Sequence, residues 1–288
     1  MNTTISYTTL PEFDYASPDT LKEALSLLNI YQSDAVVLAG GTDLLPELRH
    51  RIKRPKIVID IKKIPELNEV HLNNKILTIG AAVPIITVLS LPKLDLHFNA
   101  LYQALHDFCD EILRNRATIA GNIATSSPAA DSAGPLLIFE AIIEIYSISK
   151  GKRIVKIEDF FKGVKKNCLN PDELITKIKV PVPDVGTKSA YLKMKRGAED
   201  IALVGVAGAF NSTKTVFAYS AVAPTPILVN ISMIIAENRN QTKEELFQLI
   251  WKHIQTKIHP ISDVRSGKEY RLHIAEIYTR MMLQEFLK

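Results

Sequence analysis

The chain has 288 residues, of which 47% are hydrophobic and 23% charged, and a formal net charge of +4 at neutral pH. This composition is that of a folded globular protein, and it excludes a disordered or collagen-like chain and gives no reason to expect a nucleic-acid partner. Two cysteines cannot form a disulfide scaffold or a four-cysteine metal or iron–sulfur site. The first thirty residues lack a basic start followed by an apolar stretch, so we expect no signal peptide, and the chain has no apolar run of membrane-spanning length. Together these features predict a reducing cytoplasm as the location.

The first sixty residues predict a strand and a helix followed by two buried strands. The Ser17-Pro18 pair predicts the helix start, because serine caps helices and proline suits their first position. Residues 35–38 form a valine-rich apolar run, typical of a buried strand, and lead into the tight turn Ala39-Gly40-Gly41-Thr42-Asp43. A short helix over residues 44–51 and a strand over residues 57–61 follow.

The rest of the chain mixes hairpins and helices without a regular alternation. Its predicted elements are a hairpin over residues 69–80, helices over 83–89 and 100–112, a loop over 114–122, a helix over 135–141, a hairpin of 144–148 and 153–157, a strand over 174–180, a linker over 181–187, three meander strands over 189–195, 202–211 and 215–222, and helices over 244–253 and 269–286. This order predicts an α+β fold and not a doubly wound parallel sheet.

The glycine pair Gly40-Gly41 stands between a predicted strand and a predicted helix. Glycines there let the backbone take a positive φ and let a ligand approach closely, and successive N–H groups before a helix form an anion cradle. The segment has neither G-x-G-x-x-G spacing nor the lysine of a Walker loop. A plain strand-to-helix turn is the alternative interpretation.

A second such segment is Arg114-Asn115-Arg116-Ala117-Thr118-Ile119-Ala120-Gly121-Asn122, followed by the small and polar run Ser127-Pro128-Ala129-Ala130-Asp131. It also offers hydroxyls and backbone donors at a turn. Two separated anion cradles would suit a pyrophosphate held from both sides, and two ordinary turns are the alternative.

The positive charge is concentrated in one stretch, residues 150–196. This stretch has thirteen Lys and Arg against five Asp and Glu, a balance of +8, so the remainder of the chain is −4. A solvated basic surface explains this balance, and a surface that faces an anionic cofactor or an acidic partner is the functional alternative.

The two glycine segments together closely resemble those of the FAD-binding medium subunits of molybdenum hydroxylases, the family that includes flavoprotein subunits of xanthine, carbon monoxide and nicotinate dehydrogenases. Further along the chain the resemblance continues in Tyr191-Leu192-Lys193-Met194-Lys195-Arg196 with Asp200-Ile201-Ala202, in Ala221-Val222-Ala223-Pro224-Thr225-Pro226, and in Ser262-Asp263-Val264-Arg265 with Glu269-Tyr270-Arg271. It covers nearly the whole chain, in order. The departure is Ala120, where the family usually has a second glycine; alanine is tolerated there if its φ is negative.

The resemblance implies a PCMH-type FAD-binding domain of two α+β subdomains over residues 1–181, divided at about residue 62, and a smaller C-terminal domain over 187–288 with a three-stranded antiparallel sheet and helices. It implies FAD as the cofactor, held between the subdomains, and no metal. The implied cofactor-binding residues are Val36, Val37, Leu38, Ala39, Gly40, Gly41, Thr42, Asp43, Phe108, Thr118, Ile119, Ala120, Gly121, Asn122, Asp131, Ile175 and Lys193.

Four of these residues have specific expectations or alternatives. Phe108 is expected in the helix before the second segment, near the flavin, or else in core packing. Asp131 matches a family acid that hydrogen-bonds the cofactor, with an N-cap as the alternative. Ile175 matches a family position at the sheet edge. Lys193, which matches a position in the C-terminal domain, would stabilise negative charge on a reduced flavin or else be a surface residue.

The implied function is electron transfer. In the family, substrate is hydroxylated at a molybdenum centre in a large subunit, and electrons pass through [2Fe-2S] clusters of a small subunit to FAD and then to NAD or another acceptor. The basic stretch, with Lys165 and Lys166, is expected to face the small subunit. Two other functions remain open: a stand-alone FAD-dependent oxidoreductase, and a non-catalytic assembly subunit without FAD, against which the intact glycine segments argue.

Overall fold

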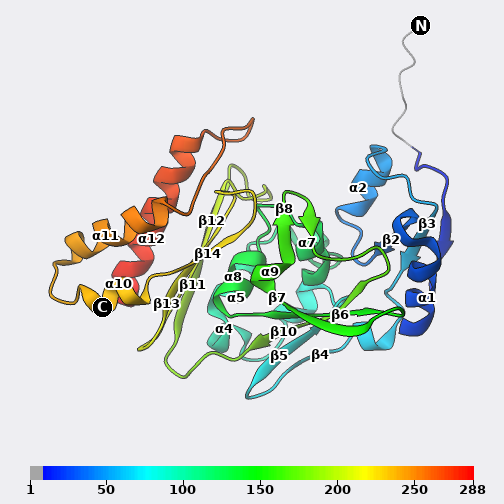
Figure 1. The fold of residues 1–288 in the computed structure, drawn as a ribbon, viewed down its shortest axis with the longest axis horizontal. Helices are drawn as coiled ribbons and strands as arrows, with labels where there is room; N and C mark the ends of the chain where they lie inside the picture. The colour runs from blue at the N-terminus through cyan, green and yellow to red at the C-terminus, as the bar shows by residue number, and fades with distance from the viewer. Residues whose placement is uncertain (1–8) are drawn as a thin grey trace, which may run out of the picture.

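The computed structural model describes residues 9–288, which form three sheets and a two-stranded ribbon arranged along the long axis of the molecule (Figure 1). A parallel N-terminal sheet (blue) lies at one end, an antiparallel central sheet (cyan and green) in the middle, and an antiparallel C-terminal sheet (yellow) beside the last helices at the other end. The α+β fold class is confirmed. Within these described residues, no helix is long and apolar enough to span a bilayer.

The N-terminal sheet has the strand order β1-β3-β2, and its two faces are covered by different helices. Ile57 and Ile59 of β3 belong to the same buried cluster as Ala24 and Leu25 of α1, whereas Val58, pointing the other way, packs on α2. The elements are β1 (Asp14–Ala16), α1 (Leu21–Tyr31), a 3₁₀ turn (Gln32–Asp34), β2 (Ala35–Leu38), α2 (Leu44–Arg49) and β3 (Ile57–Asp60).

The central sheet has the order β4-β5-β10-β6-β7, and all its pairings are antiparallel. Both predicted hairpins are confirmed, as β4–β5 and β6–β7. The strands are β4 (Val70–Leu72), β5 (Ile76–Gly80), β6 (Ile142–Ser147), β7 (Gly151–Lys156) and β10 (Leu174–Pro181), with the ribbon β8 (Phe161–Gly163) and β9 (Lys166–Asn167). The helices of this region are α3 (Ile85–Leu89), α4 (Leu94–His97), α5 (Asn99–His106), α6 (Glu111–Arg114), α7 (Ile119–Thr125), α8 (Ala133–Ile138) and α9 (Ile157–Phe160), preceded by a 3₁₀ turn (Pro65–Leu67).

The C-terminal sheet, β11-β12-β13-β14, is packed on both faces because its strands alternate between two buried sides. On β12, Val206 faces the core formed with α11 and α12, whereas Ala207 joins the core of the central region. A Cβ on Gly134 of α8 would lie 3.3 Å from the Cβ of Ala207, so α8 approaches this face closely. The elements are β11 (Lys188–Met194), β12 (Val204–Phe210), β13 (Thr215–Ser220), β14 (Ile227–Asn230), α10 (Ser232–Glu237), α11 (Lys243–Gln255) and α12 (Lys268–Phe286).

The expectation of three strands in the C-terminal sheet was wrong. The fourth strand, β14, pairs antiparallel with β13 and places Ile227 opposite Tyr219. It is only four residues long and follows Pro224 and Pro226 closely, and prolines are a signal against a strand when the sequence alone is considered.

Two predicted helix boundaries were wrong because a nearer side chain caps the helix. Helix α1 begins after Thr20, whose hydroxyl accepts from the Glu23 N–H at 3.2 Å, and not at Ser17-Pro18. The helix predicted over residues 100–112 is two helices, because Asp110 accepts from the Leu113 N–H at 2.6 Å and starts α6. Cys109, with a φ of 45°, ends the preceding turn.

Candidate functional site

A cleft of about 590 Å³ is lined by segments from all three sheet regions. Every predicted site residue lines this cleft except Leu38 and Ile119. Leu38 instead packs beside the α2 cluster, and Ile119 is fully buried in the main core. Side chains that the sequence prediction did not include also line the cleft; they include Glu47, Lys53, Cys109, Lys165, Glu173, Glu199, Asp200 and Arg265.

The first glycine segment connects β2 to α2, as predicted, and Gly40 lies directly against the second segment. A Cβ on Gly40 would be 2.2 Å from the carbonyl oxygen of Arg116 and 2.9 Å from the Cα of Ala117. Gly41 has a φ of +78°, in the left-handed region that favours glycine. The glycine at position 40 is therefore required for the contact between the two segments, which the sequence did not indicate.

The second glycine segment is the start of helix α7, and the prediction of a loop through Asn122 was wrong. Thr118 caps this helix, since its hydroxyl accepts from the Gly121 N–H at 2.9 Å. Ala120 lies within α7 and has no positive φ, so the alanine that departs from the family pattern is tolerated. A Cβ on Gly121 would meet only the Thr118 hydroxyl, at 3.0 Å, so the backbone here is open to the cleft.

The first segment and α7 run beside each other in the same direction. After the Gly40 contact, the Thr125 hydroxyl at the end of α7 donates to the Asp43 carboxylate at 2.6 Å. One turn further, Glu47 lies 3.5 Å from the ammonium of Lys165. These successive contacts join the N-terminal sheet region to the central region along the cleft.

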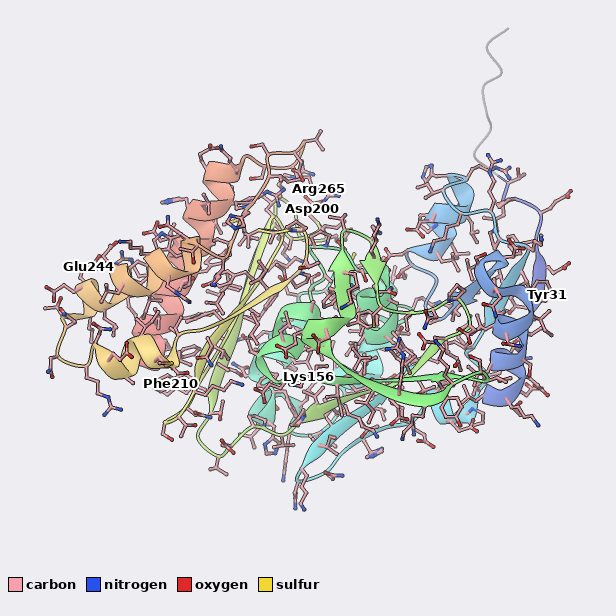
Figure 2. All side chains as sticks on the ribbon, viewed as in Figure 1. Tyr31, Lys156, Asp200, Phe210, Glu244 and Arg265 are labelled. Carbon is pink, nitrogen blue, oxygen red and sulfur yellow. The ribbon has the colours of Figure 1, made fainter. Side chains whose placement is uncertain are left out.

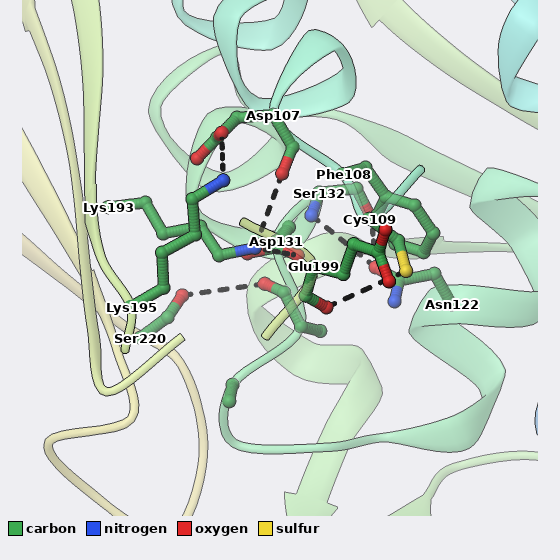
Figure 3. Close-up of polar contacts among 12 residues, drawn as sticks. Asp107, Phe108, Cys109, Asn122, Asp131, Ser132, Lys193, Lys195, Glu199 and Ser220 are labelled. Carbon is green, nitrogen blue, oxygen red and sulfur yellow. Dashed lines mark hydrogen bonds and ion pairs between the residues drawn. The ribbon is translucent and has the colours of Figure 1, made fainter. Parts of the chain in front are cut away.

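Residues 107–110 form the turn between α5 and α6 and carry Phe108 at the cleft, so the expectation of Phe108 inside a helix was wrong. One guanidinium nitrogen of Arg114 donates to the carbonyl oxygens of Phe108 and Cys109 at 3.0 and 2.9 Å. The Cys109 thiol lies 3.6 Å from the carbonyl oxygen of Glu199, on the C-terminal side of the cleft (Figure 3).

A buried ion pair between Asp131 and Lys193 lies where the central region meets the C-terminal sheet (Figure 3). The Lys193 ammonium is 3.0 Å from one Asp131 oxygen, and the Tyr191 hydroxyl donates to the other at 3.0 Å. The two charged side chains are 2% and 10% exposed, so Lys193 is not a surface residue. Burial raises the pKa of the Asp131 carboxyl, against the opposing effect of Lys193.

This pairing corrects two alternatives from the sequence. Asp131 is not the N-cap of the following helix; Ser132 occupies that position and makes no side-chain cap bond, and its hydroxyl donates to Asn122 at 2.6 Å. The charge of Lys193 is balanced by Asp131. Its ammonium makes one further contact, with the Asp107 carbonyl oxygen at 3.4 Å.

The expected position of Ile175 at the sheet edge was wrong. Ile175 lies on β10, which is the central strand of its sheet and not an edge strand.

Comparison with known proteins identifies the family. Residues 11–183 match the model of the FAD binding domain in molybdopterin dehydrogenase, and residues 189–286 match that of the CO dehydrogenase flavoprotein C-terminal domain. The chain belongs to the family of FAD-binding medium subunits of molybdenum hydroxylases. It is an oxidoreductase flavoprotein whose cofactor is FAD.

Similar proteins match over nearly their full length. The chain is 33% identical to a putative xanthine dehydrogenase FAD-binding subunit of Escherichia coli, covering 95% of this chain and 96% of that protein. It is 33% identical to a glyceraldehyde dehydrogenase medium chain of Sulfolobus acidocaldarius, covering 96% and 98%. Its fold matches a structure of carbon monoxide dehydrogenase from Hydrogenophaga pseudoflava with a TM-score of 0.88 and 30% identity, covering 97% and 98% of the two chains.

The cleft of this medium subunit fits FAD in size and in lining. Its volume of about 590 Å³ is within the ~300–1,000 Å³ range usual for small-molecule sites. The open backbone face at Gly121 leaves the space that a close-approaching ligand atom needs. Asp200 and Arg265, which are labelled close together in Figure 2, also line the cleft.

Most of the ion pairs of the basic stretch are made with acids from elsewhere in the chain, and Arg153 pairs with Glu173 inside the stretch. The ion pairs within residues 9–288 that involve this stretch include Lys152–Glu144, Arg153–Glu173, Lys165–Glu47, Lys177–Glu69, Lys179–Glu144, Lys193–Asp131, Lys195–Asp107 and Arg196–Asp200. The local balance of +8 is therefore not the charge of one exposed surface. Lys165 lines the cleft, whereas its neighbour Lys166 does not.

Replacing Arg114 with leucine should destabilise the flavoprotein, because the Phe108 and Cys109 carbonyls would lose a charged donor. We expect a loss of about 1–3 kcal/mol in the free energy of unfolding, measured by urea denaturation. Arg116→Leu is the matched control, since that exposed side chain makes no hydrogen bond among those described, and its effect should stay within about 0.5 kcal/mol. Equal losses in both variants would contradict this role.

Proposed function

We propose that this chain is the electron-transfer subunit of a molybdenum hydroxylase complex. It takes electrons from [2Fe-2S] clusters of a small partner subunit, which receives them from a molybdenum-cofactor large subunit, and it passes them to NAD or another acceptor. The observation that carries this proposal is the cleft in which the two glycine segments lie against each other at Gly40. When bound, FAD supplies the chemistry, because it accepts electrons singly and releases them as a pair.

In this proposal the protein holds and orients FAD. The backbone at Gly40, Gly41 and Gly121 binds the pyrophosphate, and Phe108 and the Asp131–Lys193 pair border the isoalloxazine. We assign residues 1–181 to the FAD-binding domain, divided at about residue 62, and residues 187–288 to the C-terminal domain, an assignment supported by the two family matches.

The partners are inferred from what this chain cannot supply and from its relatives. Its two cysteines, Cys109 and Cys168, are both free in the structure and are too few for a four-cysteine iron–sulfur site. Relatives are named medium chains, and a matched structure is named a Cu,Mo-CO dehydrogenase in its cyanide-inactivated form. Free cysteines also fit the reducing cytoplasm that we propose as its location.

Purification of the chain alone tests the proposal. We expect a yellow protein that releases FAD and not FMN on denaturation, and that shows no turnover of purines or nicotinate without partner subunits. Co-expression with an iron–sulfur and a molybdenum subunit should yield a complex in which substrate reduces the flavin. Substrate-dependent flavin reduction by the metal-free single chain would support the stand-alone oxidoreductase instead, and a colourless chain that cannot be loaded with FAD would support an assembly subunit.

A further inference from the structure

Two lysines share one glutamate at the α2 end of the cleft. The Glu47 carboxylate lies 3.0 Å from the Lys53 ammonium through one oxygen and 3.5 Å from the Lys165 ammonium through the other. All three residues line the cleft, and the lysine side chains are 49% and 53% exposed. We call this group the lysine bracket; it carries a net charge of +1.

The bracket lies beyond the glycine segments, on the side opposite Lys193. Contacts along α7 give the order: Gly40 lies against the residues before the helix, and Asp43 bonds to its last residue, Thr125. The Lys165 N–H donates to the carbonyl oxygen of Ser126 at 2.9 Å, which fixes Lys165 just past the end of α7. Lys193 comes from β11 of the C-terminal sheet, and Figure 1 shows β11 and α2 on opposite sides of the central region.

The bracket also supplies the two positively charged side chains in the cleft that are free to bind a phosphate. Among the described residues, the lysines and arginines that line the cleft are Lys53, Lys165, Lys193 and Arg265. Lys193 is committed to a buried carboxylate, and Arg265 lies at the far end. An ammonium has three donors, and each bracket lysine contacts one oxygen of Glu47, so donors remain for an anion.

We propose that Lys53 and Lys165 bind the adenylate half of FAD through its phosphate, with Glu47 as the positioning residue that holds the two ammonium groups together. The pyrophosphate lies mid-way along a dinucleotide, so a flavin beside Lys193 and a pyrophosphate at the glycine segments leave the adenylate phosphate on the side of those segments that faces the bracket. The bracket then contributes to the selection of FAD over FMN, which lacks the adenylate group. This inference rests on the cleft being the FAD site.

The test measures dissociation constants of the apoprotein for FAD, FMN and ADP in the variants Lys53→Gln and Lys165→Gln. Each substitution should raise the dissociation constants for FAD and ADP by about tenfold, which corresponds to the loss of one charge-assisted hydrogen bond. The dissociation constant for FMN should stay unchanged. ADP carries the adenylate half without the isoalloxazine, so it reports on this end of the cleft without any contact to the flavin ring. Both lysines are half exposed, and losing either ion pair should cost little stability.

Two matched controls are neighbouring lysines outside the cleft. Lys166 is adjacent to Lys165, and Lys56 pairs with Asp34 on the surface; neither lines the cleft. Their glutamine variants should bind all three ligands as the parent does. FAD and ADP binding that is unchanged in Lys53→Gln and Lys165→Gln, or FMN binding weakened equally, would overturn the inference while leaving the FAD site intact. A parent protein that binds no FAD would overturn the proposed function itself.

Discussion

Replacing Gly40 with valine should abolish FAD loading and also destabilise the apoprotein. The added Cβ would lie 2.2 Å from the carbonyl oxygen of Arg116, and this neighbour is backbone, which cannot rotate away as a side chain does. The two glycine segments would have to separate, and their separation would dismantle both sides of the proposed pyrophosphate site. We expect no bound flavin after purification and a lower midpoint of urea unfolding, since overpacking of this kind costs about 1–3 kcal/mol or more.

Gly121→Ala is the matched variant that distinguishes an effect on FAD binding from an effect on folding. Its Cβ would meet only the Thr118 hydroxyl, and alanine in place of glycine favours a helix by up to about 1 kcal/mol, so folding should be preserved. The methyl group would nevertheless occupy space on the cleft side of α7. We therefore expect normal stability with weaker FAD binding, measured by flavin fluorescence quenching. Unchanged FAD affinity in both variants would exclude these segments from the site.

The glycine segments could be predicted from the sequence because their signal is local. A strand, two glycines and a helix follow one another within a few residues, and the structure keeps that order. The expectation that this strand is buried was wrong, because β2 is an edge strand of its sheet and its four residues are only half-buried. The reason for Gly40 was not predictable, because its close neighbour, Arg116, is far away in the sequence. The helix boundary at Asp110 was also not predictable. The apolar spacing continues through this residue, and the spacing alone does not show that the Asp110 side chain ends one helix and caps the next.

Charges were the least predictable feature. The basic stretch is a count along the chain, whereas its ion pairs are made with acids such as Glu47 and Asp107, which lie outside the stretch. For the same reason Lys165 was considered with Lys166 as one surface, although only Lys165 lines the cleft. Pairing across the fold depends on strand order and loop placement, and single-residue patterns do not contain that information.

Replacing Lys193 with methionine should destabilise the protein strongly near neutral pH. The Asp131 carboxylate would remain buried with only the Tyr191 hydroxyl as a partner, and removing one member of a buried ion pair typically costs about 3–5 kcal/mol. Lys195→Met is the control, because the Lys195–Asp107 pair is more exposed and should contribute about 1 kcal/mol or less. Urea unfolding of the three proteins at neutral pH measures the difference.

The pH dependence of this loss follows from Asp131. Burial already raises the pKa of its carboxyl in the parent, so the folded state binds this proton more tightly than the unfolded chain does. The stability gained from that tighter binding is lost as the pH rises through the folded-state pKa. Without the Lys193 ammonium, burial is less opposed and the pKa of Asp131 should rise further. The loss of unfolding free energy in Lys193→Met, relative to the parent, should therefore become smaller as the pH falls. The double variant Asp131→Asn/Lys193→Met should be more stable than Lys193→Met at neutral pH. Two results together would contradict this explanation: a stability loss of Lys193→Met that does not change with pH, and a double variant that is no more stable than Lys193→Met. Lost side-chain packing, and not the unpaired carboxylate, would then account for the effect.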